Sequence, residues 1–224
     1  MIVRMSAGME ITMKQTDIIN PFQPYMTLEM DGYSQINRTD YGISHFYEFT
    51  IHDEKKHCIK AVPDASIDLL FNIGENKVST YISGTVFGVK KWELGTQDDC
   101  FGVRFQPGQG ILPKDITMEM IVNDDIEIDG DIFGKNLTEK IALAKTMSER
   151  IDIFKKAYED MVLGRNSLSD KEKINEYLVN RISRTKGMIT MRQLEDETNY
   201  SACYLRRIFK SFHGISPKQF AQYI

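Results

Sequence analysis

Residues 200–220 read YSACYLRRIFKSFHGISPKQF and carry the most specific signal in the chain. Their apolar residues recur at three- and four-residue steps, which is the spacing of one face of an α-helix. These residues are Leu205, Ile208, Phe209 and Phe212. Ser201 is a typical N-cap, and Gly214 is a typical residue just beyond a helix end. The pattern predicts a helix over residues 202–213.

Successive residues of an α-helix are about 100° apart, and this angle places three cationic side chains and a small thiol on the face opposite the apolar one. These side chains are Cys203, Arg206, Arg207 and Lys210. A helix fits the major groove, where arginine can donate two hydrogen bonds to guanine. Lys210 and the hydroxyl of Ser201 are better placed for phosphates. With Tyr204, these residues predict a DNA-contacting surface; a solvated face of an ordinary helix is the alternative interpretation.

One shorter helix is expected before the helix over residues 202–213, and another is expected after it. Thr190 is the expected N-cap of the first, which ends near Asn199, a residue that tolerates the left-handed conformation of a tight turn. Ser216 and Pro217 begin the second, with a capping side chain followed by proline at the first helical position. The three segments together predict a helix-turn-helix.

The pattern YS..YL.R.FK...G.SP..F resembles the first helix-turn-helix of AraC/XylS-family transcription regulators. By this resemblance, the base-reading positions fall on Cys203, Arg206 and Arg207. The family usually has a small residue where this chain has Glu195, and a glycine where it has Asn199. Its DNA-binding unit also contains a second helix-turn-helix, which this sequence does not include. We therefore expect weak, salt-sensitive DNA binding from this chain alone.

The net charge also differs between the part of the chain that contains the predicted helix-turn-helix and the part before it. Residues 165–224 hold 11 Lys and Arg against 6 Asp and Glu, a net charge of +5. Residues 1–164 hold 17 against 26, a net charge of −9. A basic segment joined to an acidic one favours contact with a polyanion through the basic part. We expect two domains, residues 1–164 and 165–224.

Residues 25–106 contain short segments rich in β-branched and aromatic residues, separated by turn signals. The expected strands are 42–51, 58–62, 67–73, 78–83 and 101–105. After Pro107 the periodicity becomes helical, over 137–146 and 148–163. This predicts an α+β protein: an N-terminal antiparallel β-barrel or sandwich with helices, then an all-α helix-turn-helix subdomain.

The segments VPDASIDLLFN (62–72) and GVRFQPG (102–108) resemble the β-barrel regulatory domain found before the DNA reader in part of the same family. The resemblance implies a domain that senses an effector or forms a dimer. Charged residues within apolar strands must be paired when they face inward. The candidate ligand-binding residues are Phe46, Asp64, Asp68, Phe71, Trp92 and Arg104. An internal Arg–Asp pair and plain aromatic core are the alternatives.

No sequence pattern of a hydrolase, nucleotide-binding or metalloprotease site occurs, so no enzyme activity and no cofactor are expected. His52, His57 and Cys58 lie around one turn, but their spacing matches no common metal site. The composition, 42% hydrophobic and 27% charged, is that of a soluble globular protein. Three widely spaced cysteines and the lack of a signal or membrane segment favour the cytoplasm.

The resemblance thus implies an AraC-type transcription regulator that binds double-stranded DNA, forms a homodimer and is controlled through its N-terminal domain by a small-molecule effector or by dimerisation. Two other functions remain open. The chain could be an interaction module that forms mixed dimers with an intact regulator, or an enzyme that uses Asp64 or Asp68 inside the barrel.

Overall fold

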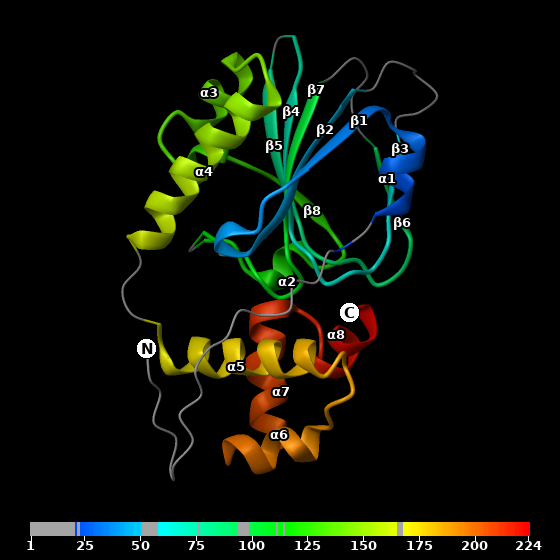
Figure 1. The fold of residues 1–224 in the computed structure, drawn as a ribbon, viewed down its shortest axis with the longest axis vertical. Coiled ribbons are helices and arrows are strands. Elements are labelled where there is room, and N and C mark those ends of the chain that lie inside the picture. Colours follow the sequence, from blue (N-terminus) through cyan, green and yellow to red (C-terminus); the bar gives the residue numbers. More distant parts are fainter. Residues whose placement is uncertain are drawn as a thin grey trace.

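The β-rich part of the sequence forms a six-stranded antiparallel sheet in the computed structural model (Figure 1). Its strands lie in the order β1–β2–β7–β4–β5–β8. Their bounds are Asp31–Asn37 (β1), Ile43–Thr50 (β2), Asp68–Ile73 (β4), Val78–Ser83 (β5), Asp99–Phe105 (β7) and Asp125–Ile128 (β8). The structure describes residues 21, 23–50, 58–75, 77–93, 99–110, 112–113, 115–164 and 168–224.

The predicted α+β class and antiparallel pairing are confirmed, but the sheet is open rather than closed into a barrel. Within the described ranges, β1 and β8 are edges that do not pair with each other. Strand β8 is four residues long and is followed by a 3₁₀ turn at Gly130–Phe133, and among the described residues after it there is no strand that could close the sheet. Strands β3 (Cys58–Ala61) and β6 (Lys90–Glu93) pair with each other and form a separate two-stranded sheet. Helix α1 (Pro24–Glu29) packs on β3.

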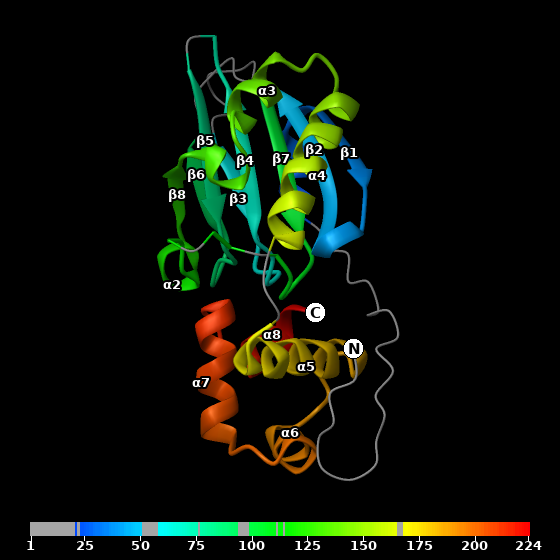
Figure 2. The same ribbon diagram turned by 90° about the vertical axis from the view of Figure 1, so that its left-hand side faces the viewer.

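The main core lies between one face of the sheet and helices α3 (Leu137–Leu143) and α4 (Met147–Leu163), as Figure 2 shows. Residues of this core come from the central strands and from the apolar stripe of α4. The largest fully buried ones are Phe46, Phe71, Phe101, Phe105, Phe154 and Tyr158. On the other face of the sheet, Tyr47, Phe49 and Cys100 form a smaller cluster with Met26 and Met30, from α1 and its C-terminal end.

The C-terminal part consists of helices α5 (Asp170–Arg184), α6 (Met191–Thr198), α7 (Ala202–His213) and α8 (Pro217–Tyr223). They enclose a separate apolar core around Leu178, Leu205 and Phe209. The predicted helix over residues 202–213 is confirmed, with Ser201 as N-cap and Gly214 in the left-handed conformation after it. Across the described ranges, none of the helices combines the length and apolar character needed to cross a bilayer.

The two parts meet at one end of the sheet. Helix α2 (Met118–Ile121) contacts the C-terminal end of α7 (Figure 1). A Cβ atom placed on Gly214 would lie 2.3 Å from Cγ2 of Val122, so this contact is tight. A Cβ atom on Gly108 would lie 3.0 Å from Cγ1 of Val179 on α5. Ala65, from the loop before β4, packs against the C-terminal core.

Candidate nucleic-acid interface and polar cavity

Helices α6 and α7 form the predicted helix-turn-helix. Thr190 and Gln193 make a capping box at the start of α6, each bonding the other's backbone N–H. The turn between the helices depends on Asn199, whose φ of 59° is left-handed. Asparagine adopts this conformation more readily than most residues, which explains why it can replace the glycine usual at such a turn.

The polar face of α7 is exposed as the sequence predicted. Cys203, Arg206, Arg207 and Lys210 are all open to solvent, whereas Leu205, Ile208 and Phe209 are buried. The guanidinium of Arg207 lies over the ring of Tyr204, 5.3 Å from its centroid, which restrains both side chains. In Figures 1 and 2 the N-terminal end of α7 points away from the sheet, so the sheet does not cover it.

Glu195 stands where the resemblance leads one to expect a small residue, and the structure gives its side chain a capping role. Its Oε1 accepts a hydrogen bond from the backbone N–H of Ala202, 2.5 Å away, at the first position of α7. Ser201 accepts a second bond, from the N–H of Tyr204 at 3.3 Å. Two of the free N–H groups at this helix end are therefore satisfied by side chains, and one of those side chains is an anion.

His213 at the C-terminal end of α7 is buried between Phe209 and Phe220, and its Nε2 lies 2.8 Å from Oδ1 of Asn175 on α5. Burial lowers its pKa to about 3. The folded protein therefore keeps this ring neutral at a pH where the unfolded chain, with a histidine pKa near 6.5, binds a proton.

We expect His213 to make the protein acid-labile. Because its folded pKa lies below its unfolded pKa, its contribution to stability is complete above pH 6.5 and declines towards pH 3. At pH 5 the loss is about 2 kcal/mol relative to pH 8. The measurement is urea unfolding at both pH values, with His213→Gln, which cannot be protonated, for comparison. An equally large difference between pH 8 and pH 5 in the variant would contradict this assignment.

A row of polar residues crosses the sheet at the end that faces the helical part. Strand register places one residue from each of five neighbouring strands beside the next on the same face. From β2 to β8 these residues are His45, Arg104, Asp68, Ser83 and Asp125. Three of them, His45, Ser83 and Asp125, were not among the predicted site residues, because only the register aligns them.

Arg104 lies between His45 and Asp68 in this row, and its side chain is buried. Its Nη1 bonds Oδ2 of Asp68 at 2.7 Å, and its Nη2 bonds Oδ2 of Asp64. Gln23 also donates to Asp64, at 2.9 Å, and Tyr47 donates to Asp68, at 3.2 Å. The structure therefore brings Asp64, Asp68 and Arg104 together, as predicted, in one network of hydrogen bonds.

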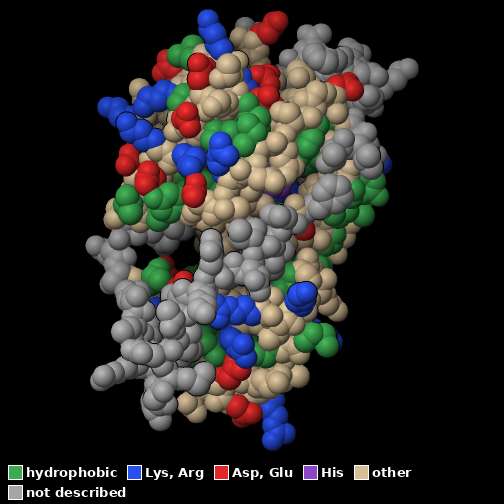
Figure 3. Space-filling model, viewed as in Figure 1, with side chains coloured by type: hydrophobic (Ala, Val, Ile, Leu, Met, Phe, Trp, Pro, Cys, Tyr) green, Lys and Arg blue, Asp and Glu red, His purple; other side chains and the backbone are tan. Residues whose placement is uncertain are grey.

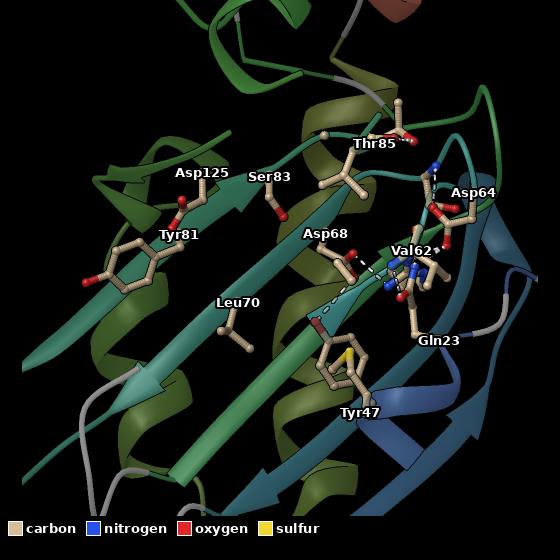
Figure 4. Close-up of a pocket in the computed structure, with 16 residues that line it drawn as sticks. Gln23, Tyr47, Val62, Asp64, Asp68, Leu70, Tyr81, Ser83, Thr85 and Asp125 are labelled. Atoms are coloured by element: carbon tan, nitrogen blue, oxygen red, sulfur yellow. Dashed lines mark hydrogen bonds and ion pairs between the residues drawn. The ribbon is translucent and has the colours of Figure 1, made fainter. Parts of the chain in front are cut away.

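A cavity of about 70 Å³ lies over this network (Figure 4). Its wall includes Asp64, Asp68 and Arg104 from the predicted set. Tyr47, Tyr81, Ser66, Ser83, Thr85 and Asp125 also line it. In Figure 4, Asp64 and Asp125 lie at opposite sides of the cavity, with Ser83 and Asp68 between them.

Two other predicted ligand residues lie elsewhere. Phe46 and Phe71 are fully buried in the main core and pack on Phe154 of α4, so they are not in the cavity wall. Successive side chains of a strand point to opposite faces of the sheet, so the chain neighbours of Phe46 and Phe71, which are Tyr47 and Leu70, face the cavity instead. The side chain of Trp92, in β6, is outside the described residues, as are His52 and His57.

Burial sets the protonation states in the row. It raises the pKa of Asp68 to about 6, although Arg104 acts in the opposite direction. Burial, with the positive charge of Arg104, lowers the pKa of His45 to about 4. At neutral pH the row therefore holds a neutral histidine. In the part of the chain that the structure describes, no group of three or more His, Cys, Asp or Glu side chains is arranged to hold a metal ion.

The comparisons with known proteins reach only the β-rich part. No curated protein and no solved structure matches the chain. Residues 41–127, which run from before β2 into β8 and include Asp64, Asp68 and Arg104, match the family model described as Domain of unknown function (DUF6597), and a helical region follows this match.

Proposed function

We propose that this chain is a DNA-binding transcription regulator of AraC type, whose sheet domain senses a small-molecule effector. One observation carries the proposal: α7 presents Arg206, Arg207 and Lys210 to solvent after a tight left-handed turn at Asn199. This is the geometry of a helix that enters the major groove. Lys and Arg side chains also lie along the helical part in Figure 3.

The contacts between the two parts support a route from effector to reader. The loop from Val62 to Ser66 forms part of the cavity wall, and Ala65 within it packs on the C-terminal core. The backbone of Ala65 accepts a hydrogen bond from the N–H of Gly108, whose own loop lies against Val179 and Phe220. A ligand that displaces this loop would change the contact surface on which the helical part packs, and so the position of the helix-turn-helix.

The test is binding to duplex DNA, measured by fluorescence anisotropy at low and physiological salt with the region upstream of the gene as probe. Wild type is expected to bind weakly and to lose affinity as salt rises. Arg206→Ala/Arg207→Ala is expected to lose at least about tenfold in affinity at low salt, since each arginine contact is worth about 1–3 kcal/mol.

Lys156→Ala/Lys171→Ala is the matched control. It removes the same charge from exposed positions on α4 and α5, outside α7. This control is expected to keep nearly the wild-type affinity. An equal loss in both double variants, or no binding by wild type at low salt, would contradict the proposed reader and would favour the interaction module.

A further inference from the structure

The two arginines on the exposed face of α7 differ in how their side chains are held. The guanidinium of Arg207 lies over the ring of Tyr204, 5.3 Å from its centroid. Among the described residues, the side chain of Arg206 has no hydrogen bond, ion pair or ring contact. Both arginines are exposed, so burial does not account for the difference.

Tyr204 is itself fixed by two neighbours. It is partly buried and packs against the C-terminal core. The ring of Tyr200, in the turn before α7, lies 5.1 Å from the ring of Tyr204, centroid to centroid. Arg207 follows Tyr204 by three residues and therefore lies on the same side of the helix. This arrangement ties an exposed guanidinium to the core through one aromatic ring.

The restraint on Arg207 matters for recognition of a base edge. Guanine offers two acceptors in the major groove, and a guanidinium must take one orientation to donate to both. A side chain that already holds a restricted position loses less conformational entropy when it forms these bonds. An unrestrained arginine still attracts phosphates, because that attraction depends on charge and tolerates many orientations.

We infer that Tyr204 is a positioning residue that holds Arg207 for the N7 and O6 atoms of one guanine, whereas Arg206 acts through its charge. The face of the tyrosine ring attracts the guanidinium, and the hydroxyl takes no part in this. The inference rests on the proposed function and deepens it, since it names the base and gives the two arginines unequal roles.

Two duplexes that differ in one acceptor test the inference. The probe is the region upstream of the gene, made once with guanine and once with 7-deazaguanine throughout. The modified base has carbon in place of N7 and still pairs with cytosine, so only the major-groove acceptor is lost. In fluorescence anisotropy at low salt, the whole chain is expected to bind the guanine duplex about tenfold tighter, since a hydrogen bond from a charged donor is lost in the other.

The ratio of the two affinities separates the roles of the residues. Arg207→Ala is expected to bring this ratio close to one. Arg206→Ala, the matched control at the next position, is expected to weaken binding to both duplexes equally and to keep the ratio. Tyr204→Leu retains an apolar side chain on the core and is expected to reduce the ratio about two- to fivefold, the contribution of an exposed cation–π contact. Tyr204→Phe retains the ring and is expected to keep the wild-type ratio.

Tyr204→Met is a second variant, for use if Tyr204→Leu does not fold by circular dichroism; the comparison of the two arginine variants depends on neither. Equal binding of both duplexes by wild type, an equal loss of the ratio in the two arginine variants, or a wild-type ratio in the folded Tyr204 variant would overturn the inference. In each of these cases the chain still binds duplex DNA, so the proposed function stands. Wild type that binds neither duplex contradicts the proposed function, and the inference fails with it.

Discussion

Replacing Arg104 with methionine is expected to lower the free energy of unfolding by about 3–5 kcal/mol at pH 7. The substitution leaves Asp64 and Asp68 buried together without a counter-ion. Removing one partner of a buried ion pair costs more than the pair contributes, because the remaining charge is neither paired nor hydrated. Chemical denaturation followed by circular dichroism measures the effect.

The loss in Arg104→Met is expected to shrink as the pH falls from 7 towards 5. Burial raises the pKa of Asp68 above the value near 3.9 of the unfolded chain, and the loss of Arg104 removes the charge that opposes this rise. The penalty is therefore complete above the folded pKa and disappears below the unfolded one.

Two further variants complete this test. Arg104→Met/Asp64→Asn/Asp68→Asn is expected to recover most of the stability, since no unpaired charge remains. Lys155→Met breaks a more exposed ion pair, with Asp40 at 2.6 Å, and is expected to change stability little. Wild-type stability in Arg104→Met, or no recovery in the triple variant, would refute the role given to the cluster.

Replacing Gly102 with alanine is expected to destabilise the fold by roughly 3 kcal/mol or more. Gly102 lies opposite Tyr47 in the pairing of β2 and β7, and the ring of Tyr47 lies directly on it. A Cβ atom there would be 2.0 Å from Cζ of Tyr47. The ring must move, and its hydrogen bond to Asp68 in the cavity wall is lost with it.

Gly88→Ala is the matched control, since a Cβ atom at Gly88 has no other atom within 4 Å. Thermal unfolding is expected to show a midpoint about 6–12 °C lower for Gly102→Ala than for wild type. The control is expected to stay within a few degrees of wild type. A Gly102→Ala midpoint equal to that of Gly88→Ala would mean that the Tyr47 ring has room to move.

The helix-turn-helix could be predicted almost to the residue, because local chemistry determines it. Thr190, Ser201 and Ser216 each cap the helix that follows, and Asn199 and Gly214 take the left-handed conformation. These signals act within three or four residues. The capping role of Glu195 depends on an approach between two helices and has no such local signal.

The sheet was predicted less completely. The expected strands 42–51, 58–62, 67–73, 78–83 and 101–105 correspond to β2, β3, β4, β5 and β7. The edge strands β1 and β8 were missed because half of their residues face solvent or are polar, which weakens the apolar signal. Closure into a barrel depends on how far such edges extend, and the composition of the strands does not determine it.

The candidate cavity residues divide for a similar reason. Asp64, Asp68 and Arg104 could be found in the sequence because a charge inside an apolar strand needs a partner. Phe46 and Phe71 were assigned to the ligand although they face the opposite core. Which face of a sheet a residue takes depends on register, and a shift by one residue exchanges the faces.

Glu195 holds a carboxylate at the N-terminal end of α7, the end that the proposed function places against DNA. For a chain that meets a duplex through this end of α7, an arriving phosphate competes with that carboxylate for the N–H of Ala202. The competition weakens encounters with any sequence equally and leaves contacts to base edges untouched. Under the proposed function, we therefore expect a shorter dwell time on unrelated DNA and a larger share of the affinity from base contacts.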